Sequence, residues 1–365
     1  MDDILLHIKN LTEPVQNYVE KLKAVMTHQK YIAFYGCGEI LKFIIETWIH
    51  KAGLRIDYLC DSNPAKWHTM IQGIPCISPE ELTQIKDDTA VFITTDALLK
   101  VYDFLKKRAF PFVFPVYKYD IHSSPVICSS DISKIQKKLA ETYLLLKDKR
   151  SVEVLETILQ RAFKGSDRPE MMSAVMDNDQ CFANVIRLGK HESFVDAGAY
   201  DGDTIEDFLR RVDGKFDHIY AFELCAENYR KLAANMQGKA NSAKIHCYKL
   251  GLWDSKEEIL YNSAMSESTI GGGGAKGAVD SLDAVLGNSP VTFIKLDIEG
   301  AEMHALRGAK NIIRTQKPKL AVCVYHDLRH LYEVPLYLKS LVPEYRIFFR
   351  HHTMYEYETI CYATV

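Results

Sequence analysis

The sequence predicts an α/β protein in which a strand, a glycine turn, a helix and a second strand follow one another twice. The first series covers residues 31–61 and the second covers residues 193–223, and both end in an acidic residue. The last two predicted strands, 345–350 and 358–364, are close enough in sequence to form an antiparallel hairpin at a sheet edge. A chain of 365 residues is long enough for two such domains. We therefore expect two Rossmann-like domains.

The elements justify this division in order along the chain. The first domain is expected over 1–125, with helical spacing at 1–29, a glycine turn at 36–38, an amphipathic segment at 40–50, a helix start at 78–81, and strands at 31–35, 56–60 and 90–95. Apolar residues then recur at helical spacing, which predicts a helical connector over 126–165. The second domain is expected over 166–365, with strands at 193–197, 218–223, 244–250, 291–298, 319–326, 345–350 and 358–364.

Composition excludes several classes of protein. The formal net charge of −3 supplies no basic excess for binding nucleic acid through bulk electrostatics. No window approaches 18 uninterrupted apolar residues, and the N-terminus lacks the features of a secretion signal, so we expect neither a membrane span nor export. The nine cysteines are scattered without a C-x-x-C pair, which favours free thiols in a reducing cytosol. We therefore expect a cytoplasmic protein.

The second glycine turn is crowded by Asp196, Asp201 and Asp203, which would repel a pyrophosphate. S-adenosylmethionine carries an ammonium and a sulfonium but no phosphate, so its ammonium suits a carboxylate and its own carboxylate suits the turn amides. Glu223, at the end of the next strand, can accept both ribose hydroxyls. The turn therefore predicts S-adenosylmethionine as cofactor, although Asp201 and Asp203 also suit a helix N-cap and first turn.

The same region resembles the FkbM family of methyltransferases. The resemblance covers about residues 180 to 365 and rests on the segments Phe194–Gly202, Ala221–Glu223, Ser281–Asp283, Ile294–Glu302 and Leu306–Ala309, of which the D-x-E-G-x-E pattern is the most specific. It implies a class I methyltransferase fold with seven strands, the last pair antiparallel. It also implies S-adenosylmethionine as methyl donor and, typically, O-methylation of a sugar or a natural product.

The resemblance carries cofactor roles onto individual residues. It places Asp196, Gly198 and Gly202 at the methionine end and Glu223 at the ribose, with Tyr200 in the same turn. The segment that contains Leu252 and Trp253 corresponds to the adenine contacts, although Trp253 could equally cap the core. Asp297 completes the expected cofactor-binding set.

Three residues are candidates for the chemistry. Asp297 ends the strand at 291–298, where the carboxyl ends of parallel strands face a ligand crevice. Lys295 lies on the same strand face, and Asp297, two positions away, is its expected ion-pair partner. His326 ends the next strand and suits a general base. We assign no metal ligand, because nothing in the sequence fixes the geometry of a site built from His326, Asp297 and Glu299.

Other regions leave alternatives open. In the first domain the Gly36 turn and Asp61 favour a nucleotide or nucleotide-sugar ligand, the alternative being a domain that positions the acceptor or mediates assembly. Residues 262–277 are expected to be a mobile acceptor lid or a disordered connector. We expect a small-molecule acceptor, a sugar or glycan, and leave a homo-oligomer open. The rival functions are a non-catalytic ligand-binding or assembly protein and an oxidoreductase that works through the first domain.

Overall fold

The structure is a computed structural model that describes residues 1–12, 18–50, 53–95, 97–116, 132–164, 170–264, 267–270, 274–355 and 357–365. The chain divides into two compact units. The first comprises Met1–Gln136, Glu156–Ala174 and Met354–Glu356, and the second comprises Lys137–Leu155, Val175–Thr353 and Tyr357–Val365. The domain boundaries expected near 125 and 165 lie outside the described residues and remain predictions.

The first unit is built on a six-stranded sheet in the order β3-β4-β2-β1-β5-β6, in which only the β3–β4 pair is antiparallel. The strands are β1 (Tyr31–Tyr35), β2 (Tyr58–Cys60), β3 (Met70–Ile71), β4 (Ile74–Ile77), β5 (Thr89–Ile93) and β6 (Phe112–Pro115). The helices are α1 (Asp2–Thr12), α2 (Tyr18–His28), α3 (Glu39–Ile44) continued by a π-helical turn (Ile45–Ile49), α5 (Pro79–Gln84), α6 (Leu98–Lys107) and α10 (Glu170–Ala174), with 3₁₀ turns at Pro64–Lys66 and Lys86–Asp88.

Alternating side chains in β1 explain why helices cover both faces of this sheet. Ile32 and Phe34 belong to a core cluster that contains Leu22 and Met26 of α2. Ala33 belongs to a second cluster that includes residues of α5 and α6. Because both strand faces are apolar, a parallel sheet buried on both sides is the stable arrangement.

The helix start predicted at Ser78 is confirmed as a capping box. Ser78 Oγ accepts a hydrogen bond from the Glu81 N–H at 3.2 Å, and the Glu81 carboxylate accepts one from the Ser78 N–H at 2.8 Å. This reciprocal pair satisfies two backbone donors at the start of α5.

Two long helices are divided between the units. They are α8 (Ile132–Leu145) and α9 (Lys149–Lys164), and they correspond to the expected helical connector. None of the helices in the described part of the chain combines the length and apolar character that a membrane span requires. The eight cysteines within the described ranges are all free, and Cys128 lies outside those ranges.

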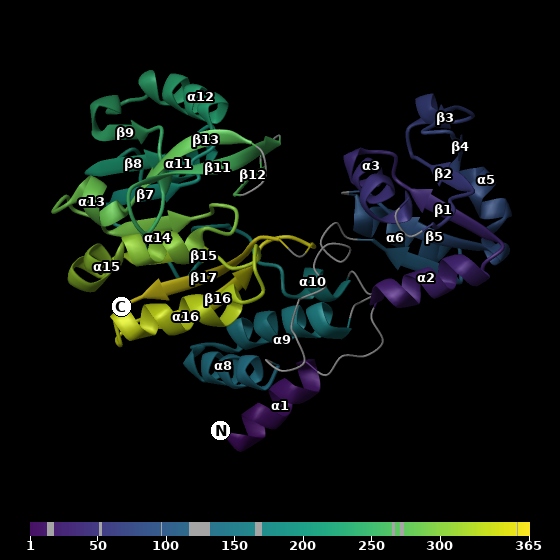
Figure 1. The fold of residues 1–365 in the computed structure, drawn as a ribbon, viewed down its shortest axis with the longest axis horizontal. Coiled ribbons are helices and arrows are strands. Elements are labelled where there is room, and N and C mark those ends of the chain that lie inside the picture. Colours follow the sequence, from purple (N-terminus) through teal and green to yellow (C-terminus); the bar gives the residue numbers. More distant parts are fainter. Residues whose placement is uncertain are drawn as a thin grey trace. The chain divides into compact units, whose positions relative to one another are not determined.

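The second unit contains the expected seven-stranded sheet, in the order β16-β17-β15-β14-β7-β8-β9 (Figure 1). Its strands are β7 (Ser193–Ala197), β8 (His218–Phe222), β9 (Ile245–Tyr248), β14 (Phe293–Leu296), β15 (Lys319–Cys323), β16 (Arg346–His351) and β17 (Thr359–Thr364). All neighbouring pairs are parallel except those that involve β17, which confirms the antiparallel hairpin. The helices are α11 (Asp203–Arg211), α12 (Ala226–Gln237), α13 (Leu282–Leu286), α14 (Glu302–Gly308), α15 (Lys310–Gln316) and α16 (His330–Leu341), with a 3₁₀ turn at Ser242–Lys244.

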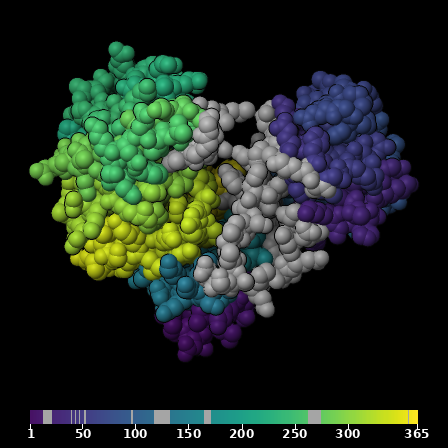
Figure 2. Space-filling model, in the orientation of Figure 1, coloured from purple at the N-terminus to yellow at the C-terminus, as the bar shows by residue number. Residues whose placement is uncertain are grey.

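The core on one face of this sheet is largely aromatic. Phe194 of β7 stacks on Phe293 of β14 with ring centroids 5.0 Å apart, and on Phe208 of α11 at 4.7 Å. The same cluster includes residues of β8, β15 and the β16–β17 hairpin. In the space-filling view the middle and C-terminal parts of this unit, green and yellow, form one continuous body (Figure 2).

A four-stranded sheet in the order β10-β13-β11-β12 was not expected from the sequence. Its strands are β10 (Gly251–Leu252), β11 (Glu257–Ala264), β12 (Glu267–Ile270) and β13 (Ala275–Asp280). The described residues of the range 262–277 lie mainly in strands, so the disordered connector is wrong for them, whereas the acceptor lid stays a prediction. The glycine- and serine-rich sequence lacks the alternating apolar residues that predict a strand. These strands are defined by backbone pairing instead, so the sequence pattern did not reveal them. Residues 265–266 and 271–273 lie outside the description.

Candidate active site

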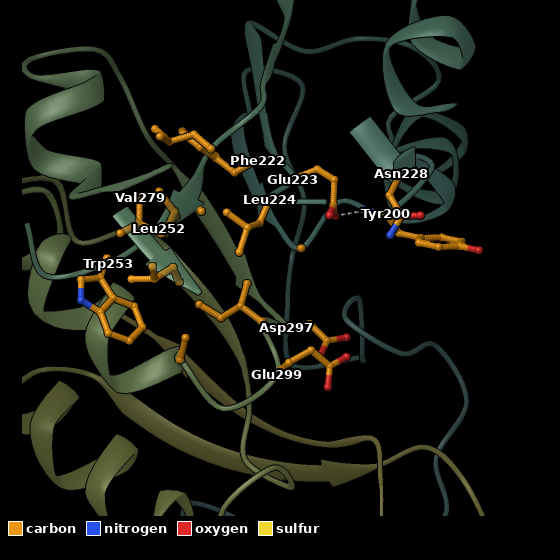
Figure 3. A pocket seen from close by; sticks show the side chains of 16 residues that line it. Tyr200, Phe222, Glu223, Leu224, Asn228, Leu252, Trp253, Val279, Asp297 and Glu299 are labelled. Atoms are coloured by element: carbon orange, nitrogen blue, oxygen red, sulfur yellow. Dashed lines mark hydrogen bonds between the residues drawn. The ribbon is translucent and has the colours of Figure 1, made fainter. Parts of the chain in front are cut away.

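A pocket opens at the carboxyl ends of β7, β8 and β14, where the strand order of the second unit reverses. This is the position at which open α/β sheets bind ligands. Figure 3 shows the side chains that line it. They are Gly198, Tyr200, Phe222, Glu223, Leu224, Asn228, Leu250, Gly251, Leu252, Trp253, Ile259, Val279, Asp297, Ile298, Glu299 and Ala301.

The glycine in the turn after β7 is required by close contacts within the chain. Gly198 has φ +74°, and a Cβ at this position would lie 1.9 Å from the carbonyl oxygen of Asp297. Glycine is therefore required because two strand ends approach each other here. The N–H groups of Gly198 and Ala199 both donate to the Phe222 carbonyl at 3.0 Å, so these amides are not free to hold the ligand carboxylate that the sequence assigned to them.

Lys295 lies beneath this turn and not in the pocket. Its side chain is 5% exposed, its Nζ donates to the Gly198 carbonyl at 2.9 Å, and it pairs with the fully buried Asp196 at 3.2 Å. The ion pair expected with Asp297 is thus replaced by one across β7 and β14, because Asp196 and Lys295 are register partners. Burial lowers the pKa of Lys295, but Asp196 and Asp297 raise it well above its ordinary value. Its Nζ is engaged by the Gly198 carbonyl and the Asp196 carboxylate outside the pocket lining, so the catalytic role of Lys295 stays a prediction.

Glu223 is fixed by two backbone donors at the centre of the pocket. Its Oε2 accepts from the Tyr200 N–H at 3.0 Å and its Oε1 accepts from the Cys225 N–H at 2.8 Å. Burial raises the pKa of Glu223, and the two amides partly oppose that shift. Each oxygen retains a second lone pair, which suits a ligand with two adjacent hydroxyls.

The end of the pocket near Trp253 is apolar, with Leu224, Leu252 and Val279 among its lining residues (Figure 3). The indole of Trp253 stacks on His304 with centroids 3.7 Å apart and ring planes 4° from parallel. One face of the indole is therefore covered by His304 within the chain, which leaves the other face and the edge for a ligand.

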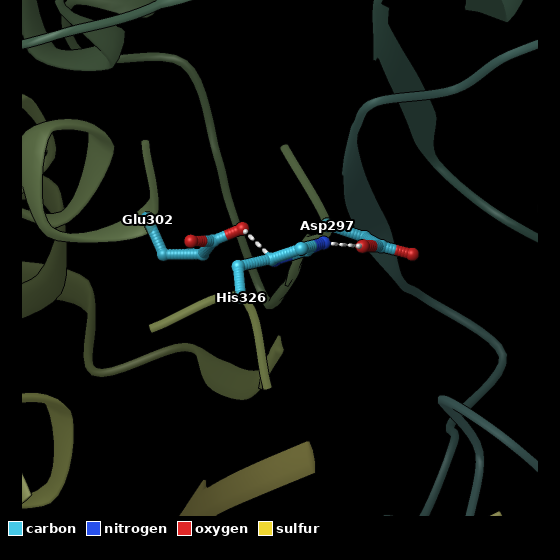
Figure 4. Close-up of side chains that lie close together, drawn as sticks. All are labelled: Asp297, Glu302 and His326. Carbon is cyan, nitrogen blue, oxygen red and sulfur yellow. Dashed lines mark ion pairs between the residues drawn. The ribbon is translucent and has the colours of Figure 1, made fainter. Parts of the chain in front are cut away.

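The opposite end carries a cluster of acidic residues around His326 (Figure 4). His326 Nδ1 lies 2.9 Å from Glu302 Oε1, and Nε2 lies 3.7 Å from Asp297 Oδ1 and 3.4 Å from Glu299 Oε2. Burial lowers the pKa of His326, but Glu302, Glu299 and Asp297 raise it well above its ordinary value. The imidazole therefore lies between carboxylates on both sides and is not among the residues that line the pocket, and its role as a general base stays a prediction.

Two residues beside Asp297 carried no sequence signal. The hydroxyl of Tyr325 donates to Asp297 Oδ1 at 3.0 Å. Burial and the nearby Asp297 raise the pKa of Glu358 to about 7. Glu358 precedes the final strand in a segment without a motif, so only the antiparallel hairpin of the folded chain reveals its proximity to this cluster.

The structure separates the predicted site residues into two groups. Gly198, Tyr200, Glu223, Leu252, Trp253 and Asp297 line the pocket, whereas Asp196, Gly202, Lys295 and His326 are not among its lining residues. Gly202 is needed elsewhere, because a Cβ there would meet Met236 Cε at 2.5 Å, and Gly202 is also the N-cap of α11. The N-cap role considered for Asp201 is therefore taken by Gly202.

Most of the residues that sequence reasoning missed are apolar. Leu224, Ile259 and Val279 line the pocket from three separate segments, and Asn228 lines it from α12. Hydrophobic residues in strands predict a core equally well, so their sequence pattern could not distinguish a pocket wall from ordinary packing.

Comparisons with known proteins found a matching family model and similar folds. A family model of the methyltransferase FkbM domain matches residues 196–356. The crystal structure of methyltransferase FkbM from Methylobacillus flagellatus KT is similar over 99% of this chain and 98% of that chain, with a TM-score of 0.78 and 21% identity. A SAM-dependent methyltransferase from Aquifex aeolicus resembles it far less, with a TM-score of 0.30 and 15% identity over 54% of this chain and 97% of that chain. No curated protein matches the chain. Residues 196–356 thus match the family model of a methyltransferase FkbM domain, and the structural similarity shows that the chain shares the fold of that crystal structure.

Proposed function

We propose that the second unit binds S-adenosylmethionine and transfers its methyl group to a hydroxyl oxygen of a saccharide or a related small molecule. One observation supports this choice above the others. Three described residues that line the pocket are acidic, namely Glu223, Asp297 and Glu299, and none of the described lining residues is basic. A sulfonium and an ammonium are favoured in such a field, and the pyrophosphate of a dinucleotide is disfavoured.

Each part of the donor has a matching part of the pocket. Glu223 is the proposed acceptor of the two ribose hydroxyls, because its carboxylate is held by backbone amides and still has free lone pairs. The apolar end formed by Leu224, Leu252 and Val279 is the proposed adenine site. The methionine end then lies toward Gly198 and Asp297, where the carboxylates attract its ammonium.

The reaction requires alignment and removal of one proton. The acceptor oxygen forms a bond to the methyl carbon as the carbon–sulfur bond breaks, and the electron pair of that bond stays on the neutral thioether sulfur. The hydroxyl proton leaves toward the carboxylate end of the pocket. In-line positioning supplies most of the acceleration in such a displacement. Asp297 is the proposed catalytic residue that faces the acceptor hydroxyl, and Tyr325 fixes its carboxylate.

The donor is tested by calorimetry on the full chain with S-adenosylmethionine and, separately, with NAD. We expect saturable binding of S-adenosylmethionine and none of NAD. Binding of NAD alone would overturn the proposal and favour the oxidoreductase alternative. A donor-turnover screen across sugars and nucleotide sugars, read out as S-adenosylhomocysteine release, then tests the acceptor class. Donor binding without turnover on any hydroxyl compound would overturn the saccharide assignment.

A further inference from the structure

The geometry points to a divalent metal site at the acidic end of the pocket, formed by the carboxylates of Asp297 and Glu299 and by Nε2 of His326. The sequence assigned no metal, because it gave no geometry for these residues. The structure supplies that geometry.

Three chain segments bring the ligands together. Asp297 follows β14, Glu299 lies in the turn before α14, and His326 follows β15. Nε2 of His326 lies 3.4 Å from Glu299 Oε2 and 3.7 Å from Asp297 Oδ1. Two ligand atoms that each lie about 2.1 Å from one metal ion are about 3.0 to 3.4 Å apart in octahedral or tetrahedral geometry. The two distances from Nε2 need only a small contraction to meet that requirement.

Glu302 fixes the orientation of the imidazole. Its Oε1 lies 2.9 Å from His326 Nδ1 and also accepts hydrogen bonds from the N–H groups of Ile298 at 3.0 Å and Gly300 at 3.4 Å. The Glu302 side chain is fully buried on the Nδ1 side of the ring, and Nε2 is directed at Asp297 on the other side (Figure 4). A buried carboxylate behind a metal-binding histidine is the usual arrangement for setting its tautomer.

The imidazole itself distinguishes this cluster from ordinary surface acids. The His326 side chain is 7% exposed, its Nδ1 forms an ion pair with Glu302, and its Nε2 makes no hydrogen bond of acceptable geometry within the described residues. Buried polar atoms normally have such partners. Three carboxylates also surround this single imidazole, so the cluster stays net negative even when the ring is protonated. A bound cation would satisfy both the unpartnered nitrogen and the excess charge.

The ligand set favours a metal of the Mn²⁺ class. Carboxylates suit Mg²⁺, Ca²⁺ and Mn²⁺, whereas imidazole suits transition metals, and Mn²⁺ accepts both kinds of ligand. If the proposed function is correct, the cation would hold the acceptor oxygen and increase the acidity of its hydroxyl. Asp297 would then act on the acceptor through the metal. This second role rests on the proposed function, whereas the metal site does not.

The test is a titration of the metal-stripped full chain with MnCl₂, followed by the EPR signal of free Mn²⁺, in the absence of any methyl donor. We expect one saturable site per chain. Glu299→Gln and His326→Gln should each weaken Mn²⁺ binding at least tenfold. Glu302→Gln should weaken it about 10- to 100-fold through the ring orientation alone.

Asp254→Asn provides the matched control. Asp254 is a carboxylate paired with another histidine of the same unit, His304, at 3.0 Å, and its removal should leave Mn²⁺ binding unchanged. Thermal melting of every variant shows that the unit is folded. Absence of Mn²⁺ binding by the wild-type chain, or equal loss in Asp254→Asn, would overturn the site and leave the proposed donor untouched. If the chain bound Mn²⁺ but not S-adenosylmethionine, the proposed donor would be overturned and the metal site would stand.

Discussion

In the first unit the N–H of Gly36 donates to the Cys60 carbonyl at 2.8 Å, and in the second unit the N–H of Gly198 donates to the Phe222 carbonyl at 3.0 Å. Both glycines have positive φ, +112° and +74°, and a Cβ on either would collide with the strand end across the switch point. The colliding backbone belongs to Thr94 in one unit and to Asp297 in the other. The two turns therefore share one backbone design.

The acids that end the second strands also match. Asp61 accepts from the N–H of Cys37 at 3.0 Å and of Asn63 at 2.9 Å, as Glu223 accepts from Tyr200 and Cys225. Asp61, however, also pairs with Lys66 at 2.7 Å. Burial raises the pKa of Asp61, but the Lys66 ammonium and the two amides together lower it below its ordinary value, whereas the pKa of Glu223 is raised by its burial.

A second difference concerns the side chain that donates to the carbonyl of the glycine. Thr94 Oγ1 donates to the Gly36 carbonyl at 2.9 Å, and Lys295 Nζ donates to the Gly198 carbonyl at 2.9 Å. In the second unit the cation, Lys295, is buried under the turn, and carboxylates line the pocket. In the first unit the acid, Asp61, forms an ion pair with Lys66. The glycine turn and the acid at the end of the next strand are therefore common to both units. Whether such a turn can hold a cationic ligand depends on where the neighbouring charges lie. The nucleotide ligand predicted for the first unit loses its main argument, because Asp61 is already occupied.

The largest effect on stability is expected when the side chains that donate to the two glycine carbonyls, Lys295 and Thr94, are replaced. Lys295→Met leaves Asp196 buried without a partner, and breaking a buried ion pair from one side costs about 3–5 kcal/mol of unfolding free energy. Thr94→Val removes a neutral hydrogen bond and should cost about 1–2 kcal/mol. Urea unfolding of both variants measures the difference. Equal losses would show that the lysine contributes no more than a hydroxyl.

The next effect concerns the two terminal acids and the methyl donor. Glu223→Ala removes both proposed ribose contacts, and hydrogen bonds to a charged group are worth about 1.5–3 kcal/mol each, so S-adenosylmethionine affinity should fall about 100-fold or more. Asp61→Ala should leave that affinity unchanged. Calorimetry measures S-adenosylmethionine affinity for both variants. If Asp61→Ala weakened donor binding as strongly as Glu223→Ala, the assignment of the donor site to Glu223 would be wrong.

The Lys66–Asp61 pair should contribute little to stability. The Lys66 side chain is 35% exposed, and exposed pairs are usually worth about 0–1 kcal/mol. Lys66→Met should therefore lower the unfolding free energy by no more than about 1 kcal/mol. If Lys66→Met lowered the unfolding free energy as much as Lys295→Met in the same urea experiment, exposure would not explain the difference between the Lys66–Asp61 and Lys295–Asp196 pairs.

The opposite pKa shifts predict that the two acids lose their contributions at different pH values as the pH falls, and this effect is the smallest. The pKa of Asp61 lies below its ordinary 3.8, so its stabilisation is present above that value and is lost as the pH falls through the lowered pKa. The pKa of Glu223 lies above its ordinary 4.5, so donor affinity should begin to fall at a higher pH than for an ordinary glutamate. Calorimetry with S-adenosylmethionine from neutral to acidic pH measures this, with Glu223→Gln as the control. A variant whose affinity keeps the wild-type pH dependence would refute the assignment to Glu223.

The sequence by itself determined strands β1, β2 and β5 of the first sheet, the seven strands of the second sheet with their terminal hairpin, the helix start at Ser78 and the acid that follows β8. These features depend on local patterns: apolar runs for buried strands, fixed spacing for caps, and a strand that ends in an acid beside a glycine turn. Such signals are complete within about ten residues, so the rest of the fold is not needed to recognise them.

Only the tertiary structure decided which charges meet. Lys295 pairs with Asp196, its register partner in β7, instead of with Asp297 on its own strand. His326, Glu302 and Glu358 converge on Asp297 although they come from separate elements. Electrostatic partners are set by distances in space, and in a parallel sheet the nearest charge lies across the strand rather than along it. For the same physical reason the sequence identified the acidic turn but not the residues that neutralise it.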